Sequence, residues 1–338
     1  MQFDEIEFHN VAELEQTEQG YKLRRIPRSV AANLNEGLQI RSSNFASGVE
    51  LRFRIKDEEV KIHLRAEERK EAQTALIYFG SIQGGWQYST KNIGTEDTVI
   101  TIKYPDNMEC LEEITDKAAL PFSPYMVRVV LPYGIISYLG REGKTEPPHP
   151  GDMPEECYLA YGSSITHGSL ALAPAYAYSF LIAEKMKVDY LNQGYAGTAH
   201  MEAEMAEYLV GRKDWSFATL EMGVNMLDTE LANEEYEERI HKFLEVFKED
   251  GRPVFVTDIF THNGGKPKQD RTTVFRSIVK RQAECLGLPY TPGNELLNRV
   301  EHVSADFTHP TGEGHREIAE NWCRKLYYFL YNRESSMP

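Results

Sequence analysis

The sequence predicts a two-domain protein in which an antiparallel β-sandwich precedes an α/β/α domain built on a parallel sheet. Three observations predict this fold class. Residues 48–140 contain runs that alternate apolar and polar side chains at strand spacing, residues after 157 alternate strands with amphipathic helices, and a polar segment separates the two patterns. The length of 338 residues also exceeds that of one typical compact domain.

The first domain is predicted from its period-2 patterning. Residues 48–55 turn Val49, Leu51, Phe53 and Ile55 to one face and charged side chains to the other, and residues 60–66 repeat the alternation after the turn KDEE. This is typical of an antiparallel hairpin with one solvated face. Further strand-like runs lie at 74–82, 98–104, 125–131 and 134–140, with no long helical pattern between them. We therefore predict a β-sandwich of jelly-roll type over residues 1–145.

The second domain is predicted from a change in the pattern of expected secondary structure. Residues 141–156 are polar and contain four prolines, which indicates a linker at 146–156 and a second domain at 157–338. Beyond it, strand-like runs alternate with helical patterns, and Asn233 is the expected cap of one helix; the strands are expected at 157–161, 188–194, 217–223, 253–259 and 288–293. Repeated strand–helix units imply a parallel sheet that is covered on both faces.

In such a sheet, ligands bind beyond the carboxyl ends of the strands. The segments that directly follow the strands are therefore the ones expected to carry function: 162–168, 194–200, 223–228 and 261–269.

Composition argues against several classes of function. The formal net charge is −15 and no basic stripe is evident, which argues against nucleic-acid binding. No apolar run is long enough for a membrane span, and the N-terminus lacks the features of a secretory signal. The four cysteines are far apart and no Cys/His cluster has metal spacing. We expect a cytoplasmic protein that needs no metal or other cofactor and has no membrane partner.

Two adjacent serines follow the first strand of the second domain, at positions 163 and 164 between Gly162 and Gly168. A serine at a sharp strand-to-helix turn can act as a nucleophile if a base takes its proton. A helix-capping serine is an equally simple interpretation, and taken alone it is the more common one.

Three further fragments sit at crevice positions, each with a structural alternative. Gly197, in LNQGYAGTAH, can expose a backbone N–H to a ligand or form a tight turn. Asn225 can donate a hydrogen bond into the crevice or form an Asx-turn. Asp306 and His309 are three residues apart, which suits either a carboxylate that orients an imidazole or a surface ion pair.

Taken together and in this order, the fragments resemble the four sequence blocks of the SGNH (GDSL-type) hydrolases. The matching blocks are GSSIT at 162–166, NQGYAG at 192–197, GVN at 223–225 and DFTHP at 306–310. The resemblance spans about residues 157–331 and is greatest to the branch with an N-terminal β-sandwich, as in two-domain carbohydrate acetylesterases. It implies a flavodoxin-like α/β/α catalytic domain.

The resemblance also implies a role for each matching residue. Ser164 is the implied nucleophile, His309 the general base and then acid, and Asp306 the residue that orients His309. The implied oxyanion hole consists of the N–H groups of Ser164 and Gly197 and the side-chain amide of Asn225, and one such donor stabilises a transition state by roughly 3–4 kcal/mol. Ser163 stands where the family commonly has an aspartate, so the contribution of that aspartate is open here.

Other candidates are weaker. His167 lies three residues after Ser164 and is a candidate for substrate binding, although such a histidine is more often a satisfied polar residue. His302 and His315 compete with His309 for the role of base, but neither has a carboxylate at the matching spacing. Trp86 follows GSIQGG and is a candidate for stacking on a sugar ring, with core packing as the more common alternative.

We therefore expect a serine esterase that hydrolyses small acyl esters, most plausibly O-acetyl groups on carbohydrate. The alternatives are a lipase or thioesterase for longer acyl chains and a catalytically inactive carbohydrate-binding protein. A nucleotide-binding protein ranks lower because neither GxGxxG nor GK[ST] follows the first strand of the second domain. The sequence leaves open the sugar, the ester position, contact between the sandwich and the substrate, and the oligomeric state, a homo-oligomer included.

Overall fold

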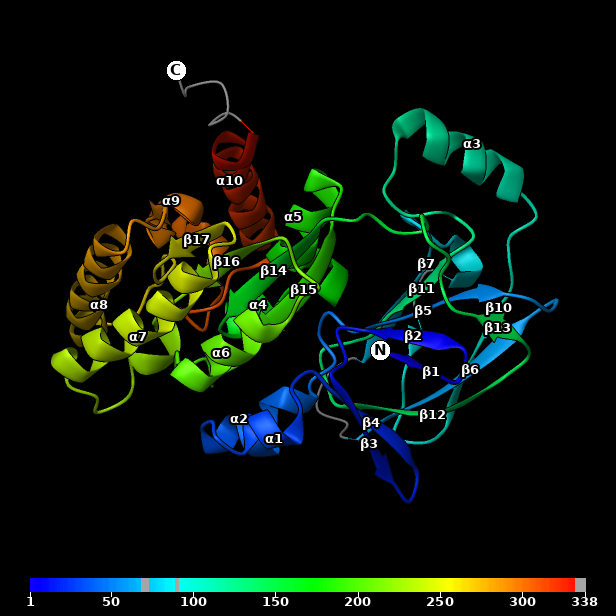
Figure 1. Cartoon of the computed structure of the whole chain (residues 1–338), viewed down its shortest axis with the longest axis horizontal. Coiled ribbons are helices and arrows are strands. Elements are labelled where there is room, and N and C mark those ends of the chain that lie inside the picture. The colour runs from blue at the N-terminus through cyan, green and yellow to red at the C-terminus, as the bar shows by residue number, and fades with distance from the viewer. Residues whose placement is uncertain (68–72, 89–90, 332–338) are drawn as a thin grey trace.

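The computed structural model describes residues 1–67, 73–88 and 91–331. Figure 1 shows an antiparallel β-rich domain, coloured blue to green, beside a parallel-sheet domain that runs from green to red. The predicted mixed α/β fold class is thus confirmed. The predicted ranges of the domains and linker remain a proposal, and the last seven residues of the second range lie outside the described residues.

Two antiparallel sheets face each other in the N-terminal domain. The first has the order β1-β2-β5-β11-β7-β8, with β13 beside β5 and β9 beside β7, and the second has the order β10-β6-β12-β4-β3. The strands of the first sheet are β1 (Gln2–Phe3), β2 (Ile6–His9), β5 (Glu50–Ile55), β7 (Thr74–Phe79), β8 (Ile82–Gln83), β9 (Lys91–Asn92), β11 (Val127–Val130) and β13 (Thr145–Glu146). Those of the second are β3 (Glu13–Thr17), β4 (Gly20–Arg24), β6 (Val60–Ala66), β10 (Thr98–Ile102) and β12 (Ile136–Glu142).

The core of the sandwich follows the alternation seen in the sequence. Leu51 and Phe53 of β5 pack in one apolar cluster with Ile62 and Leu64 of β6, so the predicted apolar faces meet between the sheets. The predicted pairing of these two segments as a hairpin is wrong, because β5 pairs with β2 and β11 whereas β6 pairs with β10 and β12. Alternation fixed which side chains point inward, but it carried no information on which strands pair.

The sandwich also contains helices that the periodicity did not reveal. The longest, α3 (Met108–Ala118), buries only Leu111 and Thr115, so its apolar stripe is too short to register as a helical pattern. The others are α1 (Arg28–Ala31), α2 (Glu36–Ile40) and the 3₁₀ turns η1 (Ser42–Asn44) and η2 (Trp86–Tyr88).

The second domain is a five-stranded parallel sheet of order β15-β14-β16-β17-β18. Its strands are β14 (Cys157–Gly162), β15 (Asp189–Gly194), β16 (Phe217–Glu221), β17 (Val254–Thr257) and β18 (Tyr290–Thr291). The direction of winding reverses between β15 and β16, on either side of β14. The carboxyl end of β14 therefore lies at a topological switch point, where open α/β sheets bind their ligands.

Helices cover both faces of this sheet, as predicted (Figure 1). They are α4 (Ser164–His167), α5 (Tyr178–Met186), α6 (Ala203–Gly211), α7 (Asn233–Asp250), α8 (Lys266–Cys285), α9 (Gly293–Leu296) and α10 (Gly312–Tyr331), with the short turns η3 (Pro174–Tyr176), η4 (Val224–Met226) and η5 (Val300–His302). Two details refine the sequence prediction: Ala232 caps α7 in place of Asn233, and α8 begins at Lys266, so it contains part of the segment 261–269 that follows a strand.

The N-terminal segment reaches across to the second domain. Ile26, Leu34 and Leu38 belong to the apolar cluster that also contains residues of α6 and α7, and Figure 1 shows α1 and α2 beneath α6. On the other face, Leu76, Tyr78 and Val130 of the sandwich join the cluster under α5 and α10. The two domains therefore share apolar cores on both faces of the parallel sheet. Within the described ranges, no helix has the length and apolar character that a membrane span requires.

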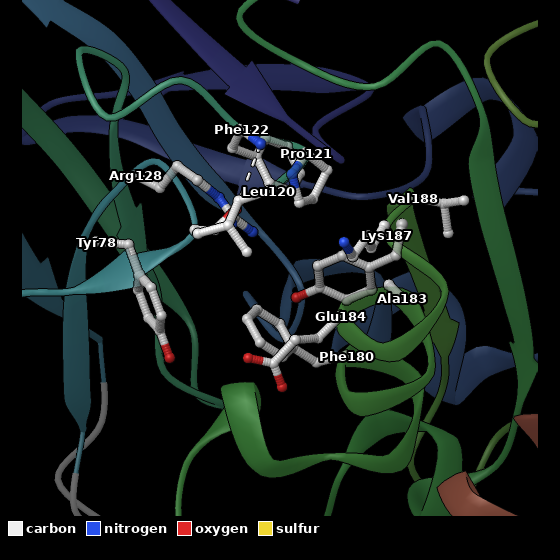
Figure 2. A pocket seen from close by; sticks show the side chains of 12 residues that line it. Tyr78, Leu120, Pro121, Phe122, Arg128, Phe180, Ala183, Glu184, Lys187 and Val188 are labelled. Atoms are coloured by element: carbon white, nitrogen blue, oxygen red, sulfur yellow. Dashed lines mark hydrogen bonds between the residues drawn. The ribbon is translucent and has the colours of Figure 1, made fainter. Parts of the chain in front are cut away.

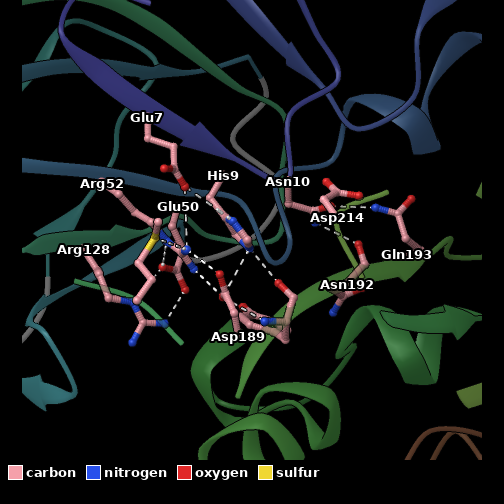
Figure 3. Close-up of polar contacts among 12 residues, drawn as sticks. Glu7, His9, Asn10, Glu50, Arg52, Arg128, Asp189, Asn192, Gln193 and Asp214 are labelled. Carbon is pink, nitrogen blue, oxygen red and sulfur yellow. Dashed lines mark hydrogen bonds and ion pairs between the residues drawn. The ribbon is translucent and has the colours of Figure 1, made fainter. Parts of the chain in front are cut away.

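A buried network of charges joins the domains (Figure 3). Arg52 of β5 makes two hydrogen bonds of 2.7 Å with Asp189 at the start of β15, and its Nε donates to Glu50. Arg128 of β11 binds both carboxylate oxygens of the same Glu50. Burial alone would raise the pKa of Glu50, but the guanidinium groups of Arg128 and Arg52 lower it to about 2. The four groups are therefore held as ions inside the junction.

Beside this network the junction contains a pocket of about 100 Å³ that is partly open to solvent (Figure 2). Aromatic rings from both domains form its walls, including those of Phe122 and Phe180, and the Arg128 guanidinium lies 4.1 Å from the centre of the Phe122 ring. The junction is thus well packed around its charges but not completely filled.

Asp189→Asn is expected to destabilise the protein by up to about 3–5 kcal/mol at neutral pH, because it removes one of the carboxylates that pair with the buried Arg52 and leaves Glu50 to balance that charge. Burial alone would raise the pKa of Asp189, but Arg52 holds it well below its usual range. As pH falls, Asp189 therefore takes up a proton in the unfolded chain before it does so in the folded protein. The difference in free energy of unfolding between wild type and variant should then shrink in acid. Chemical unfolding at several pH values measures this difference. Glu113→Gln, which breaks an exposed ion pair with Lys117, should leave stability unchanged, and an equal effect of both variants would contradict the prediction.

Candidate active site

The two adjacent serines lie at the switch point and have different surroundings. Ser163 caps α4: its Oγ accepts a hydrogen bond of 3.1 Å from the N–H of Ile165. Ser164 is the first residue of α4, and its Oγ lies 2.7 Å from Nε2 of His309. The capping interpretation therefore applies to Ser163. Gly162 is required before them, because a Cβ there would lie 2.4 Å from the Glu221 carboxylate.

A buried carboxylate holds this turn from below. Glu221, the last residue of β16, accepts hydrogen bonds from the N–H of Ser163 at 2.7 Å, from the Ser163 hydroxyl, and from the Thr166 hydroxyl at 2.9 Å. Burial raises the pKa of Glu221, although these hydrogen bonds oppose the rise. Sequence reasoning missed this residue. Its signal was an acidic side chain at the end of the otherwise apolar strand FATLE.

The structure brings Asp306 and His309 together with Ser164. Nδ1 of His309 lies 2.6 Å from Oδ2 of Asp306, and the other carboxylate oxygen accepts hydrogen bonds from the N–H groups of Thr308 and His309 and from the hydroxyl of Ser304. Partial burial would raise the pKa of Asp306, but these hydrogen bonds hold it well below its usual range. An ionised Asp306 that accepts a hydrogen bond from the Nδ1–H of His309 leaves Nε2 of His309 as the acceptor that faces Ser164.

The other predicted donors follow neighbouring strands. Gly197 lies in the turn after β15 with a φ of 75°, which favours glycine. Asn225 lies in η4 after β16, and its Oδ1 accepts a hydrogen bond of 3.1 Å from the N–H of Ala199. The Nδ2 hydrogens of Asn225 therefore point away from that loop. The N–H of Ser164 is in the first turn of α4, where a helix offers no internal acceptor.

The competing histidines are engaged elsewhere. His302 contacts Glu317 at 2.5 Å, and the buried His315 contacts the carbonyl of Ser169 and the N–H of Tyr178. His167 is buried between the rings of Phe45 and Tyr133 at the domain junction. Burial first, and then the charge of Arg25, lower the pKa of His167 to about 3. Of these residues only His309 contacts Ser164, and a substrate-binding role of His167 remains a prediction.

Trp86 lies on the surface of the sandwich. Its side chain is 99% exposed in η2, beside a groove of about 480 Å³ that is also lined by Gln83, Gln87 and Asn107. The core-packing alternative is therefore wrong for this tryptophan. Within the described residues, no group of three or more His, Cys, Asp or Glu side chains is arranged to hold a metal ion.

Comparison with protein families identifies the second domain. The model of the GDSL-like lipase/acylhydrolase family matches residues 160–317, which include all four sequence blocks. The chain carries a GDSL-like lipase/acylhydrolase domain. That domain places the protein among the carboxylic ester hydrolases. A search of curated protein sequences found no match.

Solved structures share the arrangement of both domains. Salicylyl-acyltransferase SsfX3 from a tetracycline biosynthetic pathway aligns with a TM-score of 0.75 at 16% identity, over 96% of this chain and 95% of that one. A family two carbohydrate esterase from Cellvibrio japonicus aligns with a TM-score of 0.61 at 11% identity, over 96% of this chain and 95% of that one. An acetyl xylan esterase (Est2A) from Butyrivibrio proteoclasticus aligns with a TM-score of 0.59 at 12% identity, over 98% of this chain and 97% of that one. The fold in which a β-sandwich precedes a parallel-sheet domain therefore recurs in these structures.

Ser163→Asp introduces the residue common in the GDSL family. It is expected to destabilise this protein by at least about 2 kcal/mol, because the new carboxylate would lie in a buried site against the carboxylate of Glu221. Since burial already raises the pKa of Glu221, the defect should be smaller in acid, where one of the two groups is protonated. Thermal unfolding between neutral and acidic pH measures it.

The double variant Ser163→Asp/Glu221→Gln is the matched control, because it places the carboxyl group at position 163 and a neutral amide at position 221, so the site still contains one carboxyl group. It should recover much of the stability and esterase activity that Ser163→Asp loses. A double variant no better than the single one would show that the two sites are not coupled through charge.

Proposed function

We propose that the protein is a serine esterase that removes small acyl groups, in particular O-acetyl groups, from carbohydrate through Ser164, His309 and Asp306. One observation carries the proposal: the Ser164 Oγ to His309 Nε2 distance of 2.7 Å, continued by the 2.6 Å contact between His309 Nδ1 and Asp306. A hydroxyl, an imidazole and a carboxylate in this chain of contacts form an activated nucleophile.

The proposed reaction has two halves. His309 takes the proton of Ser164 as Oγ attacks the ester carbonyl, and the oxyanion forms beside the N–H groups of Ser164 and Gly197 and the amide of Asn225. The intermediate collapses, the alcohol leaves with the proton from His309, and an acyl-enzyme remains. Water then attacks the acyl group with His309 again as base, which releases the acid and restores Ser164.

The carbohydrate assignment is supported by analogy and by one surface feature. Both named esterases have the same two-domain fold and act, by their names, on carbohydrate or acetyl xylan. The exposed Trp86, with amide side chains around its groove, supplies the flat apolar face and hydrogen-bonding groups that suit a sugar ring.

Ser164→Ala and His309→Ala are expected to abolish release of the alcohol from an aryl acetate while circular dichroism and the thermal midpoint stay close to wild type. Asp306→Asn should lower kcat by about 10²–10⁴-fold, because the imidazole loses the group that orients it and stabilises its charge. A fully active, folded Ser164→Ala would refute the proposed nucleophile.

Substrate range is tested on the wild-type enzyme with acetyl and octanoyl esters, followed by acetylated oligosaccharides. A preference for octanoyl esters would favour a lipase or thioesterase, and sugar binding without turnover would favour an inactive binding protein. The molar ratio of released acetate to released alcohol separates hydrolysis from acyl transfer, because hydrolysis releases both in equal amounts whereas transfer to another sugar releases the alcohol alone.

Trp86→Ala is expected to raise KM for an acetylated oligosaccharide by several-fold, since stacking on one ring contributes about 1 kcal/mol. The same variant should leave kcat and KM for an aryl acetate unchanged. Steady-state kinetics on both substrates checks this, and equal effects on both would exclude a sugar-specific role.

A further inference from the structure

Strand β15 lies at the edge of the parallel sheet, so the carbonyls on its outer side need partners from elsewhere. Side chains of the N-terminal domain supply them. His9 lies 2.6 Å from the carbonyl of Tyr190, Asn10 donates to that of Asn192 at 2.9 Å, and Arg25 donates to those of Asn192 and Gly194. The labelled side chains in Figure 3 show His9 and Asn10 approaching this strand from the sandwich.

The same row of contacts continues beyond the strand into residues 194–198, which we call the oxyanion loop because it contains Gly197. The Ser42 hydroxyl donates to the carbonyl of Ala196 at 3.3 Å, and the Asn35 amide donates to that of Thr198 at 2.9 Å. Alternate carbonyls from 190 to 198 are thus all held by side chains of the first 42 residues.

Holding these carbonyls also fixes the N–H groups between them. All described peptide bonds are trans, and in a planar trans peptide the C=O of one residue and the N–H of the next point in opposite directions. Where Arg25 holds the Gly194 carbonyl, the N–H of Tyr195 points the other way and donates to the carbonyl of Gly162 at 2.8 Å, directly before the two serines. Where Ser42 holds the Ala196 carbonyl, the N–H of Gly197 points away from the sandwich by the same rule.

Arg25 carries a charge that its contacts do not neutralise. Its side chain is fully buried, it donates to the carbonyls of Ser42, Asn192 and Gly194, and it lies 4.7 Å from the centre of the Tyr195 ring. No carboxylate of the described residues is among the groups that shift its pKa, which burial lowers. Burial of an unpaired cation is costly, which argues for a role beyond packing.

The charge of Arg25 acts on a residue of α4, the helix that begins with Ser164. After burial, the charge of Arg25 is the next cause of the lowered pKa of His167, which lies in the same short helix as Ser164. A positive charge here would favour an oxyanion beside Ser164 and disfavour the imidazolium that forms on His309, so the two effects of the charge oppose each other.

We propose that Arg25 and Ser42 of the N-terminal domain are positioning residues for the oxyanion loop, so that ester hydrolysis requires the sandwich as part of the active site. This inference rests on the proposed role of Gly197 as an oxyanion donor. Both residues act through the orientation of the backbone, Arg25 through the carbonyls of Asn192 and Gly194 and Ser42 through that of Ala196.

The test compares four variants of the full chain on an aryl acetate. Arg25→Met is expected to lower kcat by about 10–100-fold with little change in KM, somewhat less than the loss of a complete oxyanion donor. Arg25→Lys, which keeps the charge but replaces the forked guanidinium with a single ammonium group, should fall between Arg25→Met and wild type. Ser42→Ala should lower kcat by several-fold, and it decides the question if Arg25→Met does not fold.

Arg252→Met is the matched control. Arg252 also holds three carbonyls, those of Val210, Arg212 and Trp215, and lies 3.4 Å from the centre of an aromatic ring, but it sits at the opposite end of the sheet from Ser164. Its loss should lower the thermal midpoint and leave kcat unchanged.

A second readout separates positioning from simple stability. An alkylboronic acid adds to a serine hydroxyl as a tetrahedral anion, so its inhibition constant should rise in Arg25→Met by about the same factor as kcat falls. Wild-type kcat and boronic acid affinity in folded Ser42→Ala and Arg25→Met would overturn the inference and leave the proposed function intact. Activity that survives in Ser164→Ala would instead refute the proposed function, and this inference with it.

Discussion

The open edge of β15 is the constraint around which the two domains are arranged. An edge strand buried against another domain must have its carbonyls satisfied, because an unpaired buried polar group costs as much as a lost hydrogen bond. The sandwich meets this need with the side chains of His9, Asn10 and Arg25, and it adds the ion pair of Arg52 with Asp189 at the start of the same strand. The position of the sandwich is therefore fixed by hydrogen bonding as well as by apolar packing.

A buried carboxyl group and a buried guanidinium group sit behind the candidate active site. Glu221 holds the turn that carries Ser164, and Arg25 holds the loop that carries Gly197. Each binds mainly backbone groups and hydroxyls of the segment it supports, so each sets the direction of a backbone segment and leaves the reacting groups free. Such preorganisation is the main way in which a protein stabilises a developing oxyanion, because donors already in place need not reorganise during the reaction.

The sequence was informative where local pattern decides structure. Alternation and helical spacing predicted the two kinds of sheet, and the switch-point logic of a parallel sheet indicated where Ser164, Gly197 and Asn225 would lie. It was uninformative where contacts are distant: β5 and β6 look like a hairpin in sequence, yet they belong to different sheets. The short amphipathic helix α3 was missed because two buried side chains give too little periodic signal.

By itself the sequence determined the fold class, the parallel sheet with helices on both faces, and the short list of polar residues beside its strand ends, because these follow from local spacing and turn chemistry. Only the tertiary structure decided that Ser163 is the cap and Ser164 the partner of His309, that Glu221 lies beneath them, and that Arg25 supports the loop after β15. Apart from the local cap made by Ser163, these contacts join residues 58 to 169 positions apart. Their specificity comes from burial and hydrogen-bond geometry, which exist only once the second domain has folded and, for Arg25, only once the two domains have packed together.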